Sequence, residues 1–260
     1  MHNKLCTKGK SLGLIGRPLS HSFSKQYFEK KFKVLNLTGY RYDNIELDTL
    51  ENLRDTVDRL GLDGFNVTHP YKMGILPLLD ELDDTARRIS AVNTVKVDRS
   101  GGIMTLTGYN TDAPAFLETL RPLLRPWHDK ALILGTGGAA RAVSWALNEL
   151  GIDSLFVSRN PKKSNQISYR KAYELAPKKT IIINATPVGM GTLKDSSPWA
   201  RPDLLTSNHL CYDLIYNPAQ TCFLQEATFQ GATTINGLNM LYRQADIAFD
   251  IWTNKENFCL

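Results

Sequence analysis

The stretch ALILGTGGAARA, residues 131–142, decides the fold predicted for this chain. Its first four apolar residues predict a buried strand, and a glycine-rich turn leads from that strand into a helix. Gly135, Gly137 and Ala140 give the pattern G-x-G-x-x-A in this strand-turn-helix context. The first glycine permits a tight turn, the second admits a pyrophosphate, and the N–H groups at the helix start bind it. The stretch therefore predicts a dinucleotide-binding site.

The residues after the next strand, Leu155–Val157, indicate which dinucleotide is bound. They are Ser158 and Arg159, followed closely by the lysines at 162–163. An NAD site usually offers a carboxylate here to the ribose hydroxyl, but the nearby acid, Asp153, lies at the wrong end of the strand. A guanidinium suits a 2′-phosphate instead. NADP is therefore favoured over NAD.

Strands and helices alternate along the rest of the chain, which predicts an α/β fold. Two domains with a cleft between them are expected: an N-terminal α/β substrate domain (1–111 and 238–260) and a Rossmann-type NADP-binding domain (112–237). Strands are expected at Leu12–Ile15, Tyr40–Leu47, Gly64–Val67, Ala131–Leu134, Leu155–Val157, Thr180–Ile183 and Cys211–Ile215, with a hairpin across Thr94–Thr107. Helices are expected at Ser24–Val34, after Asp48 as a cap, from Pro70 onward, from the glycine-rich turn to about Leu150, and at Gly237–Trp252.

Composition excludes several classes of protein. The net charge of +5 comes from scattered lysines and arginines, which does not predict a nucleic-acid partner. No apolar run approaches the roughly 18 residues of a membrane span, so no membrane partner is expected. A cytoplasmic protein is predicted, as a monomer or homodimer. No metal site or disulfide is expected, because the spacing of the four cysteines fits neither: Cys6, Cys211, Cys222 and Cys259.

Lys72 is a candidate acid or base in FNVTHPYK, residues 65–72. If Pro70 begins a helix, Lys72 lies on the same side as Ile75 and Leu76. Desolvation there favours the neutral amine, which allows lysine to exchange protons near neutral pH. A lysine that extends its amine to water is the simpler interpretation, and this segment alone favours it.

Seven motifs that occur in order along the chain favour the catalytic interpretation of Lys72. They are G-x-P-x-x-H-S-x-S at 16–24, N-V-T-x-P-x-K at 66–72, A-V-N-T at 91–94, G-x-N-T-D at 108–112, N-A-T-P-x-G-M at 184–190, Y-D-L-I-Y-N-P at 212–218 and G-L-x-M-L-x-x-Q-A at 237–245. Together they resemble the shikimate dehydrogenase family, from about Gly13 to Trp252. Ser158 departs from the family pattern, which commonly has asparagine there.

The resemblance implies that 3-dehydroshikimate and NADPH are interconverted with shikimate and NADP, a step of chorismate and aromatic amino acid biosynthesis. Lys72 and Asp112 are expected to share the hydroxyl that becomes a carbonyl and to titrate jointly, and which of them is the base stays open. Substrate contacts are expected from Ser22 and Ser24 at the carboxylate, Tyr216 near it, and Thr68, Asn93 and Gln244 at the ring hydroxyls. Cofactor contacts are expected from Gly135, Gly137, Gly138, Ala139, Ser158, Arg159, Asn184, Ala185, Thr186, Leu214 and Gly237.

Three other functions are compatible with parts of the pattern. A quinate/shikimate dehydrogenase that uses NAD is the nearest, and Arg159 with Ser22 and Ser24 favours NADP and shikimate instead. A methylenetetrahydrofolate dehydrogenase also joins a lysine-bearing domain to a nucleotide-binding one, but the serines and G-x-N-T-D favour shikimate. A non-catalytic relative that binds the same ligands is disfavoured by intact Lys72 and Asp112.

Overall fold

The computed structural model describes residues 9–19, 22–178 and 180–254 of the chain. The chain divides into two compact units. One contains the residues up to Thr111 and those from Ala245 onward, and the other runs from Asp112 to Gln244. The second boundary lies within helix α8 (Leu238–Thr253), whereas the sequence places it at 238. It falls there because the last turns of α8 pack in the hydrophobic core of the first unit.

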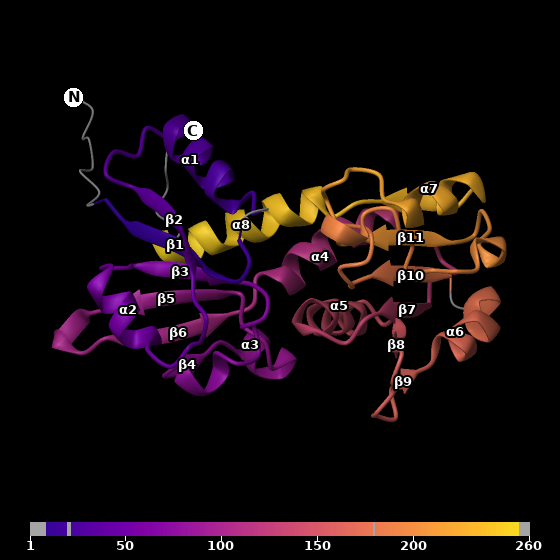
Figure 1. Ribbon diagram of the computed structural model, residues 1–260, viewed down its shortest axis with the longest axis horizontal. Helices are drawn as coiled ribbons and strands as arrows, with labels where there is room; N and C mark the ends of the chain where they lie inside the picture. Colours follow the sequence, from indigo (N-terminus) through magenta and orange to yellow (C-terminus); the bar gives the residue numbers. More distant parts are fainter. Residues whose placement is uncertain (1–8, 20–21, 179, 255–260) are drawn as a thin grey trace. The chain divides into compact units, whose positions relative to one another are not determined.

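The first unit is built on a six-stranded mixed sheet in the order β2-β1-β3-β5-β6-β4 (Figure 1). β1 is parallel to β2 and β3, while β5 runs antiparallel to both β3 and β6. Its strands are β1 (Ser11–Gly16), β2 (Arg41–Glu46), β3 (Gly64–Val67), β4 (Glu81–Leu82), β5 (Thr94–Asp98) and β6 (Thr105–Tyr109). Its helices before α8 are α1 (Ser24–Val34), α2 (Leu53–Arg59) and α3 (Asp84–Ile89), with 3₁₀ turns at Leu76–Leu78 and Ser100–Gly102.

Trp252 anchors the end of α8 in this unit. Its side chain is buried, and its Nε1 donates a hydrogen bond of 2.9 Å to the carbonyl of Val95 on β5. A Cβ atom on Gly64 of β3 would lie 2.3 Å from the Trp252 ring, so only glycine leaves room for it. Phe28 of α1 stacks on Tyr42 of β2 in the same core, with ring centroids 4.4 Å apart. The C-terminal segment thus completes the core of the N-terminal unit.

The second unit is built on a six-stranded sheet in which every pair of neighbouring strands is parallel. The order β12-β11-β10-β7-β8-β9 is that of a Rossmann fold, in which the chain winds outward from the centre in both directions (Figure 1). The strands are β7 (Lys130–Leu134), β8 (Asp153–Val157), β9 (Gln166–Ile167), β10 (Ile181–Asn184), β11 (Leu210–Asp213) and β12 (Thr233–Ile235). The helices are α4 (Asp112–Leu120), α5 (Gly138–Glu149), α6 (Tyr169–Leu175), α7 (Cys222–Phe229) and the first part of α8, with 3₁₀ turns at Arg121–Leu123, Ala176–Lys178, Gly191–Leu193 and Pro202–Leu204.

The α/β class and most of the predicted strands and helices are confirmed, but the predicted cap at Asp48 is wrong. Helix α2 begins only at Leu53, and its N-cap residue is Asn52. The Asp48 carboxylate instead pairs with Arg17. The acid predicted to cap a helix instead forms an ion pair with a residue distant in sequence.

The helix predicted from Pro70 is also wrong. Residues 71–75 form turns, in which the Ile75 N–H donates to the Tyr71 carbonyl at 3.0 Å, and a 3₁₀ turn follows. Pro77 has no N–H with which to continue a helical ladder, and Gly74 weakens it further. Lys72 therefore lies in a turn, and its placement does not follow from helical spacing.

No helix within residues 9–19, 22–178 and 180–254 combines the length and the apolar character that a membrane span requires.

A buried histidine gives this fold a testable dependence on pH. His209 Nδ1 accepts a hydrogen bond from the Thr206 N–H at 3.0 Å, and Nε2 lies 3.1 Å from the Ala176 carbonyl. Burial lowers the pKa of His209. Since the unfolded value is about 6.5, the neutral ring stabilises the fold above that pH, and this contribution is lost as the pH falls.

We predict that His209→Gln reduces the loss of unfolding free energy on acidification from about pH 7.5 to about pH 5.5, because the substitute has no ring to protonate. Urea denaturation at several pH values measures this slope in the wild type and the variant. Equal slopes in the two proteins would contradict the prediction, whatever their absolute stabilities.

Candidate active site

The residues predicted to bind the cofactor all lie at the carboxyl ends of strands in the second unit. The turn that begins at Gly135 follows β7, Ser158 follows β8, and Leu214 follows β11. Asn184 ends β10, and Gly237 lies just beyond β12. Because parallel strands end at the same edge of a sheet, the structure brings these residues to one edge, where ligands of this fold bind.

Gly135 lies where the strand order reverses, between β7 and β10. Its φ angle is 106°, a conformation that side chains rarely allow. A Cβ atom on Gly135 would lie 3.0 Å from the Ala185 carbonyl oxygen and 3.1 Å from Cγ2 of Thr186. Glycine therefore permits the turn after β7 to approach the loop after β10 closely.

The start of α5 fits an anionic group. Gly137 is its N-cap residue, and a Cβ there would meet no atom within 4 Å, so the space beside it is open. The bond of 3.1 Å from the Arg141 N–H to the Gly137 carbonyl begins the helical ladder. The N–H groups of Gly138 and Ala139 precede that bond and point out of the helix end. They are suited to a pyrophosphate.

Arg159 lies exposed just beyond β8. Its turn is held by the Ser158 hydroxyl, whose oxygen accepts a hydrogen bond from the Asn160 N–H at 3.1 Å. Burial raises the pKa of Tyr169, and the positive charge of Arg159 opposes this rise. The guanidinium is thus accessible at the edge of the sheet.

The loops after β10 and β11 meet in a buried polar cluster that the sequence did not reveal. Asn184 has no exposed surface, and its amide nitrogen donates to the Asp213 carboxylate at 3.0 Å. Asp213 is also fully buried. Burial raises its pKa to about 6, against the opposing effect of its hydrogen bonds with Ile215, Thr221 and Asn184. Asn184 is therefore placed to shape the cofactor edge, while Ala185 and Thr186 follow it in the loop.

In the first unit, backbone hydrogen bonds bring three predicted residues together. The Thr68 N–H donates to the Ile15 carbonyl at 2.9 Å. The Lys72 carbonyl accepts from Val92, next to Asn93, at 2.8 Å. The Asn93 carbonyl in turn accepts from the residue before Thr68, also at 2.8 Å. The turn that carries the lysine is thus attached directly to the A-V-N-T segment.

A second buried polar network lies behind these residues. The Tyr42 hydroxyl donates to Oδ1 of Asn66 at 2.7 Å and shares a hydrogen bond with Ser24. Burial raises the pKa of Tyr42, which keeps the hydroxyl protonated. The Asn66 amide donates to the Asn93 carbonyl at 3.1 Å, and Asn93 Oδ1 accepts from the Thr111 N–H at 2.7 Å. The network runs from one predicted substrate residue to another, through a tyrosine that sequence reasoning missed.

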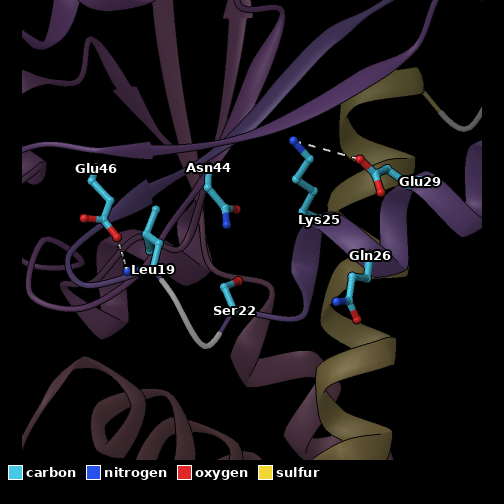
Figure 2. Close-up of a pocket in the computed structure, with 7 residues that line it drawn as sticks. All are labelled: Leu19, Ser22, Lys25, Gln26, Glu29, Asn44 and Glu46. Atoms are coloured by element: carbon cyan, nitrogen blue, oxygen red, sulfur yellow. Dashed lines mark hydrogen bonds and ion pairs between the residues drawn. The ribbon is translucent and has the colours of Figure 1, made fainter.

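A pocket of about 340 Å³ opens beside Ser22 (Figure 2). It is lined by Leu19 and Ser22 before α1, Lys25, Gln26 and Glu29 on α1, and Asn44 and Glu46 on β2. The Lys25 amine lies 3.0 Å from Asp43 and 3.9 Å from Glu29, so neighbouring carboxylates balance its charge. The Ser22 hydroxyl oxygen accepts from the Ser24 N–H at 3.3 Å, a bond that does not use the hydroxyl proton.

The remaining predicted residues are distributed over both units. Lys72 is half-buried in the first unit, and Asp112 is a buried residue that begins α4 in the second. Gln244 is buried on α8, where its Nε2 donates to the Leu241 carbonyl at 2.9 Å. Tyr216 is half-buried in the loop after β11. His21 of the first motif, Cys6 and Cys259 lie outside the described residues, and within those described there is no cluster of three or more metal-ligating side chains.

Comparison with known proteins identifies the family. A family model described as the shikimate dehydrogenase substrate binding domain matches residues 14–95. A shikimate dehydrogenase (NADP(+)) from Methanococcus maripaludis is 39% identical, and the match covers 95% of this chain and 93% of that protein. The chain belongs to the shikimate dehydrogenase family. The resemblance drawn from the seven motifs is thereby confirmed.

Solved structures of shikimate dehydrogenases and their relatives share the fold. The enzyme from Thermus thermophilus, in complex with NADP(H) and shikimate, has a TM-score of 0.82 and 33% identity, with 94% of each chain covered. A quinate dehydrogenase from Corynebacterium glutamicum in complex with NAD has a TM-score of 0.83 and 28% identity, covering 95% of this chain and 94% of that one. The shared fold is thus compatible with either cofactor.

The hydrogen bonds that join Tyr42, Asn66 and Asn93 are expected to contribute measurably to stability. We predict that Tyr42→Phe lowers the unfolding free energy by about 1–3 kcal/mol, because it leaves the buried Asn66 side-chain oxygen without this donor. Chemical denaturation followed by circular dichroism measures the change. An unchanged denaturation midpoint would show that the hydroxyl does not support the network.

Proposed function

We propose that the protein is an NADP-dependent shikimate dehydrogenase, which interconverts 3-dehydroshikimate plus NADPH and shikimate plus NADP in chorismate and aromatic amino acid biosynthesis. The main support for this proposal comes from the residues at the carboxyl edge of the parallel sheet. There a dinucleotide turn at Gly135 and an exposed Arg159 lie at the ends of neighbouring strands, in a chain of this family.

The residues at that edge fit NADP. The N–H groups of Gly138 and Ala139 would hold the pyrophosphate at the start of α5, and Arg159 would bind the 2′-phosphate. Leu214 and Gly237 would contact the nicotinamide end. When bound, the nicotinamide supplies the hydride chemistry, and the protein supplies orientation.

Six side chains are proposed to bind the substrate. Ser22 and Ser24 donate hydrogen bonds to its carboxylate, whose negative charge needs donors. Tyr216 lies near that carboxylate, and three further side chains bind the ring hydroxyls: Thr68, Asn93 and Gln244. Residues 1–111 and 238–260 serve as the substrate domain, and residues 112–237 serve as the NADP domain.

Lys72 and Asp112 exchange the proton. Oxidation of an alcohol removes a hydride from carbon and a proton from oxygen, so a titratable group is needed within hydrogen-bond reach of the hydroxyl. Two hydrogen bonds support this pair. The Lys72 carbonyl binds the residue before Asn93, and Thr111, the residue before Asp112, donates its N–H to the Asn93 side chain. These bonds attach the segments that precede or carry the two candidates to Asn93 and to the residue before it.

Steady-state kinetics with NADP or NAD, and with shikimate or quinate, test the proposal. The highest kcat/KM is expected for NADP with shikimate, followed by absorbance at 340 nm. A higher kcat/KM with NAD and quinate would establish the alternative, a quinate/shikimate dehydrogenase. No turnover with either substrate would favour a non-catalytic relative.

We predict that Lys72→Ala lowers kcat by roughly 10²-fold or more through the loss of acid–base catalysis. NADP binding, measured by titration calorimetry, should persist, since Lys72 lies in the first unit. Lys33→Ala, an exposed lysine on α1, is the control and should keep wild-type turnover. Near-normal turnover of the Lys72 variant would refute the assigned role.

We predict that Arg159→Ala raises the KM for NADP about tenfold or more while the KM for NAD changes little, because a charge-assisted bond to phosphate is lost. Arg170→Ala is the matched control, since Arg170 is an arginine of the same unit with a side chain that is 93% exposed. An equal effect of Arg159→Ala on both cofactors would count against a contact with the 2′-phosphate.

A further inference from the structure

Asp213 is a buried carboxylate that the proposed proton transfer does not use. It ends β11 and has no exposed surface. Its Oδ1 accepts from the Asn184 amide and from the Ile215 N–H, each at 3.0 Å. Its Oδ2 accepts from the Thr221 hydroxyl at 2.7 Å. Three donors from three separate segments thus converge on one side chain.

One of these bonds leads to the loop after β10. Asn184 Oδ1 accepts from the N–H of Thr186 at 3.0 Å and from its hydroxyl at 2.7 Å. The Asn184 amide donates to the Val188 carbonyl at 3.0 Å as well as to Asp213. The side chain of Asn184 therefore sets the shape of this loop, and Asp213 fixes the orientation of that side chain.

Another bond leads to the segments after β11 and β12. Asp213 accepts from the Ile215 N–H, and the Ile215 carbonyl accepts from the Gly237 N–H at 3.0 Å. A Cβ atom on Gly237 would lie 2.1 Å from the Leu214 carbonyl oxygen, so these two segments are in close contact. The carboxylate is thus tied to every segment proposed to hold the nicotinamide end of the cofactor.

We infer that Asp213 is a positioning residue of the cofactor site, which holds the Thr186, Leu214 and Gly237 segments in the arrangement that binds NADP. The inference rests on the proposed function. Asp213 acts through its neighbours, since its own side chain is fully buried. The loop after β10 is thereby coupled to the end of β11.

The geometry distinguishes a conservative variant from a disruptive one. Asp213→Ala leaves the buried Asn184 amide and Ile215 N–H without their acceptor, which is costly. Asp213→Asn keeps an oxygen for both donors. Its amide nitrogen then faces Thr221. The Thr221 hydroxyl oxygen has two acceptor sites, so it can accept from this amide as well as from the Leu224 N–H, which it binds at 3.3 Å.

The test compares kinetic constants of the two variants. Asp213→Ala should raise the KM for NADP about tenfold, because the donors it leaves unpaired reshape the loop. The KM for shikimate should rise less than the KM for NADP, since four of the six proposed substrate residues lie in the first unit, although Tyr216 follows the Ile215 segment that the substitution disturbs. Asp213→Asn should restore the KM for NADP to near the wild-type value. Dissociation constants for NADP, from titration calorimetry, should follow the same order.

Thr221→Val and Thr221→Ser provide a second pair if Asp213→Ala does not fold. The valine variant loses the hydroxyl that donates to Oδ2 and should weaken NADP binding, whereas the serine variant should retain it. Equal NADP binding by this pair would overturn the inference. So would a folded Asp213→Ala variant with an unchanged KM for NADP, or one with equal rises in both KM values. A wild-type protein that binds NADP but does not oxidise shikimate would refute the proposed function alone, because the calorimetric comparison would still test Asp213.

Discussion

The close approach of the turn at Gly135 to the Ala185 carbonyl is the constraint on which the second unit depends. The two segments leave neighbouring strands at the point where the strand order reverses, and a side chain at Gly135 would press against the loop. With glycine there, the start of α5 is presented at the same edge as the loops after β10 and β11. Under the proposed function, backbone N–H groups and a guanidinium at this edge would bind one elongated anionic ligand, and two buried polar side chains would hold the loops beside it.

Buried polar side chains hold the ligand-binding segments in both units. In the first, Asn66 joins Tyr42 to the Asn93 segment, and in the second, Asp213 joins Asn184 to the loop after β11. A buried donor or acceptor without a partner is costly, so each network favours one arrangement of its loops. The residues proposed to contact ligands are therefore held in place by buried residues that would not contact the ligands themselves.

The sequence predicted those elements whose formation depends on residues close together in the chain. Helical spacing of apolar residues gave α1 with its observed bounds, and the glycine pattern placed Gly135 at the turn after β7. The turn at Lys72 was missed because Pro77, five residues further on, prevents the helix that Pro70 suggested. Tyr42 and Asp213 were missed for another reason: their partners Asn66 and Asn184 are 24 and 29 residues away, and only the folded sheets bring them together.

A crystal structure of the protein with NADP and shikimate tests the central claim most directly. The proposed mechanism predicts the 2′-phosphate on Arg159, the pyrophosphate on the N–H groups of Gly138 and Ala139, and one substrate hydroxyl within hydrogen-bond reach of both Lys72 and Asp112. A complex in which the carbon facing the nicotinamide carries a hydroxyl that neither Lys72 nor Asp112 reaches would contradict it.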